Sequence, residues 1–421
     1  MATDVADETP VEKVSKRAVV AILITIFGST AAAMMPALIA LPIIMARIAP
    51  DNKETALGIA TGISAFGGMI LGPLFGALSD RTTSRFGMRR PGMVIGGLLA
   101  MLGLVLLGLA DSLPAVFAAL VVLAVGQALY GASHAAMTPD TIPEHARGRV
   151  VGFASMMGVL AALLAGIVGP QFIDNQFVLA AGGVPLYLLG LVVGMALYRD
   201  RRLDPAQVPP QSLLRTVVGG YRFNPKSAPD FSWVWISRFF ITLGIAFTGV
   251  FTIYLLTDHL KVSPQELPSL ISINSVLGMA SGLVGTVVGS FVTDKVRSRK
   301  RLVLVAALML AAGSAIIAFA PSVPVFFVGS ALLTFANGFL IPTDGVLVMG
   351  VLPGGDGANA KYMSFFTIAD GLPRSLGPMI APAVMTLGGM TALGGYPVLY
   401  LAGGIVAIAG GLLVRRVRGV R

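Results

Sequence analysis

An aspartate and an arginine one helical turn apart are the residues best suited to chemistry in this sequence. Asp370 and Arg374 stand at i and i+4 in an apolar stretch, and Pro373 lies between them. This spacing puts both charges on one helical face, where the proline removes a backbone hydrogen bond. Such a pair could couple proton binding to movement of a broken helix. The alternative is a permanent ion pair that offsets its own burial cost.

Two further apolar stretches carry polar residues at helical spacing. Gln127, Tyr130 and His134 share one helical face, and Asn337 and Asp344 share another. Polar groups inside a membrane are expensive and usually face a cavity or each other. They could bind a solute, with Asp344 as a second candidate for holding a proton, or they could join neighbouring helices.

Arg238 is a single cation in another apolar stretch. By helical rise it lies roughly 10 Å from the nearer end of that stretch. It could extend to the membrane interface, or it could face a cavity and bind an anionic or hydroxyl-rich solute.

Several classes of chemistry find no support. The chain has no cysteine and three scattered histidines, so we predict neither a metal site nor a cofactor. No phosphate-binding loop and no arrangement of nucleophile and base can be recognised. An enzyme is therefore not predicted.

The elements that hold these residues are membrane helices. Apolar residues make up 55% of the 421 residues and charged residues only 12%, and the mean hydropathy is +0.84. A hydrocarbon core of ~30 Å needs roughly 20 helical residues. The sequence predicts an all-α membrane protein with twelve spans, which run near 18–48, 54–78, 91–111, 114–137, 149–172, 178–198, 231–257, 268–293, 301–320, 323–350, 360–386 and 393–414. The eleventh span places Asp370 and Arg374 near the middle of the bilayer.

The net charge of +10 indicates topology rather than nucleic-acid binding. Arg47, Lys53 and Lys261 are the basic residues that fall in loops on one side, and two arginines fall within spans. All other lysines and arginines lie on the side of the N-terminus, which is the positive-inside pattern. We expect a bacterial cytoplasmic (inner) membrane protein with both termini in the cytoplasm.

The chain reads as two related halves: an N-terminal bundle (1–198), a cytoplasmic linker (199–230) and a C-terminal bundle (231–421). In each half the second span ends on an aspartate, Asp80 or Asp294, and a basic loop follows. Counted back from Pro143 and Pro353, the same two positions hold Gln127 and His134 in one half and Asn337 and Asp344 in the other. Gly-Pro also occurs in the fifth and eleventh spans. Three such coincidences in the same order favour a duplicated unit.

The loop after the second span resembles a known signature. The run Gly76-Ala-Leu-Ser-Asp80-Arg81, followed by Arg85-Phe-Gly-Met-Arg89-Arg90-Pro91, is similar to the loop 2–3 motif of the major facilitator superfamily, and its spacing resembles the glycoside and sucrose–cation symporter branches. Met88 departs from those branches, which carry a basic residue there. The first and second spans also lack the acids that those branches use for cation binding.

The resemblance implies roles for several residues. It implies that spans one, four, seven and ten line a central cavity. It also implies that Asp80 contacts the eleventh span when the cytoplasmic side is shut. The expected gating set is then Asp80, Arg81, Arg85, Arg89, Arg90 and Asp294. The alternative for the arginines is that they only keep the loop in the cytoplasm.

We therefore expect a secondary transporter that works by alternating access. Proton-coupled symport of a polar metabolite such as a sugar is the leading hypothesis. The alternatives are a proton-coupled exporter of amphipathic compounds and a membrane receptor or assembly factor that kept the fold. The expected partners are a small-molecule substrate, a proton and membrane lipids, and the chain is expected to act as a monomer.

Overall fold

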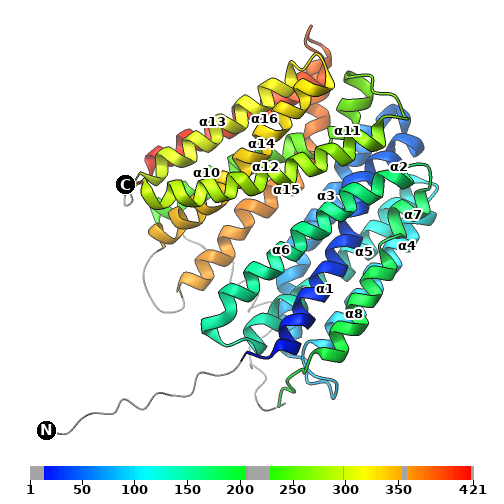
Figure 1. Ribbon diagram of the computed structural model, residues 1–421, viewed down its shortest axis with the longest axis vertical. Coiled ribbons are helices and arrows are strands. Elements are labelled where there is room, and N and C mark those ends of the chain that lie inside the picture. Colours follow the sequence, from blue (N-terminus) through cyan, green and yellow to red (C-terminus); the bar gives the residue numbers. More distant parts are fainter. Residues whose placement is uncertain (1–13, 205, 207–227, 297, 353–357, 419–421) are drawn as a thin grey trace, which may run out of the picture.

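The computed structural model describes residues 14–204, 206, 228–296, 298–352 and 358–418, and within these ranges it contains helices and no strand. Two bundles of long helices lie side by side, the first blue to green and the second yellow-green to red (Figure 1). The first bundle comprises α1 (Lys16–Met35), η1 (Pro36–Ala40), α2 (Leu41–Ile48), η2 (Pro50–Asn52), α3 (Lys53–Ser79), α4 (Arg90–Leu109), α5 (Leu113–Thr141), α6 (Glu144–Val168), η3 (Gly169–Phe172), α7 (Gln176–Ala181) and α8 (Val184–Leu197). The second comprises α10 (Pro229–Gly249), α11 (Thr252–Tyr254), η5 (Leu255–His259), α12 (Leu267–Lys295), α13 (Arg299–Ala318), α14 (Val323–Val351), α15 (Ala358–Gly389), α16 (Gly395–Leu413) and η6 (Val414–Arg416).

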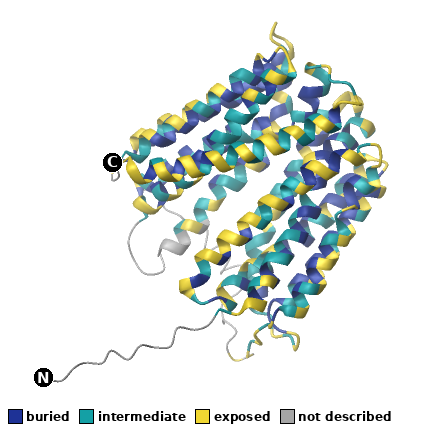
Figure 2. Cartoon of the chain, viewed as in Figure 1, coloured by how far each residue is buried: buried dark blue, intermediate teal, exposed yellow. Residues whose placement is uncertain are grey.

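Eleven helices of the described residues are long and apolar enough to cross a membrane. The remaining long helix, α15, carries the charges of Asp370 and Arg374 and is not among them. Large apolar side chains are exposed along α4, α6 and α12, and exposed residues follow the outward faces of the helices (Figure 2). Such faces fit a lipid environment. The all-α membrane fold is confirmed, while the count of twelve spans stays a prediction that rests on α15.

The two bundles repeat the same packing. In the first, α4 and α3 pack on α5 while α6 and α8 pack on α1; in the second, α13 and α12 pack on α14 while α15 and α16 pack on α10. Between the bundles, α3 packs on α15 and α6 packs on α12. In the repeat α3 corresponds to α12 and α15 corresponds to α6. The first contact therefore becomes the second when the halves are interchanged, as expected for a duplicated unit.

Matched hydroxyl pairs support the register of the repeat. Ser79 and Ser133 lie 3.4 Å apart, and Thr293 and Thr343 lie 3.0 Å apart. Each of the four stands at the same distance from the start of its helix as its counterpart. The same count pairs Gln127 with Asn337, which agrees with the sequence alignment of the halves.

The first span of each bundle departs from a regular α-helix at a corresponding point. The π-helical turn η1 begins at Pro36, which has no backbone N–H to donate. The seventh span, expected to be continuous over 231–257, instead ends its first helix at Gly249 and resumes as α11 and η5. The first helix is 20 residues long in one span and 21 in the other, so the two breaks fall within one residue of the same position.

The predicted linker 199–230 lies largely outside the described residues, so its boundaries stay a prediction. Its described beginning, Asp200 and Arg201, packs against the loop that precedes α4.

Close helix contact in the second bundle gives a test of the packing. A Cβ on Gly338 of α14 would lie 2.1 Å from the carbonyl oxygen of Gly282 on α12. We expect Gly338→Val to destabilise the protein by about 1–3 kcal/mol, because the backbones must separate. Thermal unfolding of the purified protein measures this. Gly345→Val, on the same helix with open space around its Cβ position, is the control. Equal unfolding temperatures for the two variants would contradict the packing.

Candidate functional site

A chain of four charged side chains joins three helices of the second bundle. Arg238 of α10 lies 3.3 Å from Asp344 of α14 and 2.8 Å from Asp370 of α15. Arg374 lies 2.9 Å from the other oxygen of Asp370, and the Thr242 hydroxyl donates to Asp370 at 3.3 Å. We call Asp344, Arg238, Asp370 and Arg374 the charge cluster.

Exposure rises steadily along the charge cluster. The side chains of Asp344 and Arg238 are 7% and 15% exposed, and those of Asp370 and Arg374 are 34% and 52% exposed. The Nε of Arg238 is buried without a partner among the described residues. A buried donor without a partner is costly, so the hydrogen-bonding capacity of Arg238 is not fully used in this conformation.

The sequence placed these residues on the correct helices but did not reveal that they meet. The expected pair of Asp370 and Arg374 is present, whereas Arg238 bonds two acids and does not extend to the interface. Its two pairings were missed because they join helices far apart in the sequence. The repeat gave an indication of where Arg238 lies. Arg238 stands nine residues after the first residue of α10, and Thr25 stands nine residues after the first residue of α1.

The first bundle holds a hydrogen-bonded pair at the corresponding place. His134 Nε2 lies 3.0 Å from the Thr25 hydroxyl. His134 and Asp344 each stand 21 residues after the first residue of their helix. The pair His134–Thr25 therefore corresponds to the pair Asp344–Arg238, with a hydrogen bond to a hydroxyl in place of an ion pair.

The other predicted solute contacts differ in exposure. Tyr130 is 3% exposed, donates to the Thr25 carbonyl at 3.0 Å and packs against Tyr187. It belongs to the core of the first bundle. Gln127 and Asn337 are partly buried, and neither side chain has a hydrogen-bond partner among the described residues.

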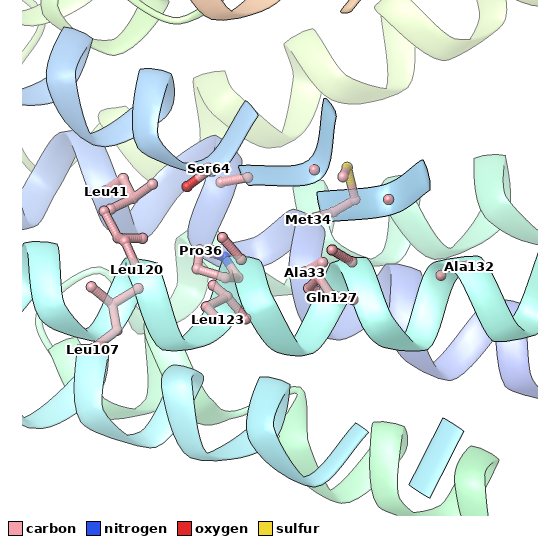
Figure 3. Close-up of a pocket in the computed structure, with 16 residues that line it drawn as sticks. Ala33, Met34, Pro36, Leu41, Ser64, Leu107, Leu120, Leu123, Gln127 and Ala132 are labelled. Atoms are coloured by element: carbon pink, nitrogen blue, oxygen red, sulfur yellow. The ribbon is translucent and has the colours of Figure 1, made fainter. Parts of the chain in front are cut away.

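Gln127 lines a recess of about 380 Å³ between α1, α3 and α5. Figure 3 shows Ser64 of α3 on one side of this recess and Gln127 of α5 on the other. Most of the remaining lining is apolar or glycine, including Met34, Leu123 and Gly68. The recess could hold a small solute with an apolar body and few polar groups.

A second network orders the basic loop between α3 and α4. The guanidinium of Arg89 lies 2.7 Å from both Asp80 and Asp140 and donates to the Ser79 hydroxyl. Burial would lower the pKa of Arg89, but the two carboxylates hold it above its ordinary value. Asp200 accepts from the backbone N–H groups of Arg89 and of its neighbour, at the start of α4. The sequence did not identify Asp140 or Asp200 as partners.

The rest of the predicted gating set makes local contacts. Arg90 donates to the carbonyls of Met195 and Tyr198, and Arg85 lies over the ring of Phe86. Asp294 has no ion-pair partner among the described residues, and its gating role stays a prediction. Arg81 lies in the same loop and is partly buried.

The resemblance implied a contact between Asp80 and the eleventh span, and this structure has Asp80 paired with Arg89 of its own bundle. No bond from Asp80 to the second bundle occurs among the described residues. The implied contact is therefore absent from this conformation, and its occurrence in another conformation stays a prediction.

Bonds between the bundles gather at the end opposite the basic loops. Lys53 of α3 lies 2.5 Å from Asp258 of η5, and the Tyr396 hydroxyl contacts both Glu54 and Asp258. The Tyr254 hydroxyl donates to a carbonyl of α2 at 2.7 Å. Burial opposes ionisation of Asp258, but Lys53, Tyr396 and Thr257 together hold its pKa below the ordinary value. We call Lys53, Glu54, Asp258 and Tyr396 the clasp.

Two bundles of long apolar helices, with a charge cluster inside one of them, define a polytopic membrane protein. The sequence profile of the Major Facilitator Superfamily matches residues 18–378 and 234–421. The chain therefore belongs to this superfamily and is a secondary transporter. No curated protein sequence matches it.

Solved transporter structures share the fold at low identity. The crystal structure of the nucleoside transporter NupG is similar with a TM-score of 0.75 at 11% identity, over 95% of this chain and 98% of that one. A D-xylose–proton symporter has a TM-score of 0.69 at 18% identity, over 96% and 97% of the two chains. A bacterial homologue of the human lysosomal transporter Spinster, inward-facing and unoccupied, has a TM-score of 0.69 at 16% identity, over 95% of both.

The clasp can be tested with a reporter cysteine, because the chain has no cysteine of its own. Ser275 of α12 faces Gly166 of α6 across the contact between the bundles. We expect Asp258→Asn to increase thiol labelling of Ser275→Cys roughly two- to fivefold, since it removes the ion pair with Lys53. Acidification below the ordinary pKa of aspartate should act in the same direction.

Asp174→Asn is the matched control, because Asp174 is an exposed acid at the same end of the molecule. Equal labelling rates in the two variants would show that the clasp does not hold this end closed.

Proposed function

We propose that this protein couples the entry of protons to the uptake of a small polar solute, and that the charge cluster carries the coupling. The observation behind the proposal is that Arg238 bonds acids from two other helices, with Asp344 almost fully buried. The solved D-xylose–proton symporter shares this fold. A site with two acids can exchange a proton, and one with spare donors can bind a polar solute.

Protonation of Asp344 is the proposed coupling step. Asp344 has one arginine partner at 3.3 Å, whereas Asp370 has two arginines and a hydroxyl. The negative charge of Asp344 is thus the less compensated of the two. A proton on Asp344 leaves Arg238 bonded to Asp370 alone, so α14 is released from α10 while α15 stays attached. This changes which helices move together.

The bonds between the bundles support alternating access. The clasp joins the bundles at one end, while at the basic end Asp80 and Arg89 bond only within the first bundle in the part of the chain that the structure describes. The Spinster homologue with the same fold is inward-facing. With the basic loops in the cytoplasm, we propose that this conformation is open to the cytoplasm and that the protein lies in a bacterial inner membrane with both termini inside.

The network around Arg89 is the proposed gate on the cytoplasmic side. Asp80 is 61% exposed at the side chain although it bonds Arg89, so it can exchange this partner for the eleventh span when that side closes. Gln127, Asn337 and His134 are the proposed solute contacts, and Tyr130 supports His134 by ring stacking. We propose that the chain acts as a monomer.

The proton role is tested by neutralising each acid. We expect Asp344→Asn to abolish uptake driven by a pH gradient while exchange of internal for external solute persists, because exchange needs no net proton movement. Asp370→Asn should also lose uphill uptake and in addition lose stability, since it leaves Arg374 without its acid partner and Arg238 paired with Asp344 alone.

The assay is a pair of measurements in proteoliposomes, pH-driven accumulation and counterflow, with a solute identified by thermal-shift screening. Asp111→Asn, in an exposed turn, is the control. If the Asp344→Asn variant still accumulated the solute against a gradient, Asp344 would not be the residue that carries the proton.

The gate predicts a different defect. Asp80→Asn should slow net transport by about tenfold while solute affinity is kept, because it removes a contact of charges in one state only. Initial rates and equilibrium binding separate the two effects. A transport rate equal to that of the unchanged protein would leave the basic loop with a role in topology alone.

A further inference from the structure

Arg374 is exposed, although the same face of α15 is buried over the next two turns. Gly377, Pro378 and Ala381 stand three, four and seven residues further along that face, and all three are buried. Pro378 packs on α3 and Gly377 on α10. The Arg374 side chain leaves the helix in a direction between those of Gly377 and Pro378. Its exposed 52% therefore faces the space between the bundles and not the lipid.

The guanidinium of Arg374 has donors to spare. Its Nε and Nη2 contact Asp370, at 2.9 and 3.4 Å. Its Nη1 has no partner among the described residues. Two donors on one edge of a guanidinium match the two oxygens of a carboxylate, which a lysine ammonium does not.

The charge cluster is balanced only in particular loading states. With both acids ionised, Asp344 and Asp370 offset Arg238 and Arg374. One proton on Asp344 leaves an excess positive charge, and one bound anion restores the balance. A net charge that is occluded away from water is costly. The protein therefore passes most easily between its inward- and outward-facing conformations in two states, with the cluster empty or with one proton and one anion bound.

We propose that the solute is a small organic monoanion whose carboxylate binds Arg374 and that it crosses together with one proton, with no net movement of charge. This inference rests on the proposed proton-coupled function and names its substrate class. A neutral sugar with a proton would leave an unbalanced positive charge in the cluster, and a dianion would leave an unbalanced negative one.

The recess beside α3 suits the body of such a solute. Met69 of α3 lies against Gly371, one turn from Arg374, and its neighbour Gly68 lines the recess. The recess offers Gln127 and Ser64 as polar groups among apolar ones. A short chain or single ring with few hydroxyls therefore fits better than a heavily phosphorylated compound.

The test uses the unchanged protein in proteoliposomes with an internal pH dye and a membrane potential fixed by valinomycin and potassium. Lactate, benzoate and glucuronate are compared with glucose, which matches glucuronate except for the carboxylate. We expect proton entry with at least one carboxylate and none with glucose, at a rate that does not change when the interior is made negative.

Proton entry with glucose, or a rate that changes with the membrane potential, would overturn the proposal that the solute is a monoanion. Proton coupling itself would still stand. Solute exchange with no proton movement for any compound would overturn the proposed function itself. The proposal of a monoanion would also be overturned if none of the carboxylates caused proton entry, provided that the protein elutes as a folded particle.

Variants of Arg374 locate the anion. Arg374→Gln should weaken carboxylate binding roughly ten- to hundredfold, and Arg374→Lys should weaken it less while keeping the charge. Arg415→Gln, an exposed arginine near the chain end, is the control. Carboxylate binding that is the same in Arg374→Gln as in the control would place the anion elsewhere.

Discussion

The cost of charge inside a membrane is the constraint on which this structure depends. Arg238, Asp344 and Asp370 would each be expensive alone in a medium of low dielectric constant, and mutual pairing offsets that cost. Since Arg238 bonds acids on two other helices, α10, α14 and α15 cannot change their packing without a change in pairing. Binding of a proton or of a charged solute alters that pairing. It therefore affects how the helices of the second bundle pack.

This constraint acts in one bundle only, although the two bundles are packed alike. Both bundles have the same helix contacts and the same hydroxyl pairs, yet the place of Asp344 and Arg238 is taken by His134 and Thr25 in the first bundle. That contact involves no carboxylate and no arginine. The first bundle thus offers an apolar wall with a recess, while the second bundle offers the charges.

The two ends of the molecule are held in different ways. The clasp joins the bundles through half-buried bonds, among them the ion pair of Lys53 and Asp258, each of modest strength. The network around Arg89 is internal to one bundle and leaves Asp80 exposed. Opening one end while closing the other therefore exchanges a few weak contacts, which suits a protein that must pass between states of similar free energy.

The sequence alone determined the helices, their approximate ends, the repeat and the superfamily, because apolar length, the positive-inside pattern and the loop 2–3 motif are local or additive signals. It also placed Asp370 and Arg374 on one face. Tertiary structure alone decided that Arg238 meets Asp344 and Asp370, that Asp80 bonds Arg89, and that Lys53 bonds Asp258. Each of these contacts joins separate helices, and whether two side chains on separate helices meet depends on helix rotation and crossing, which no run of residues within one helix specifies.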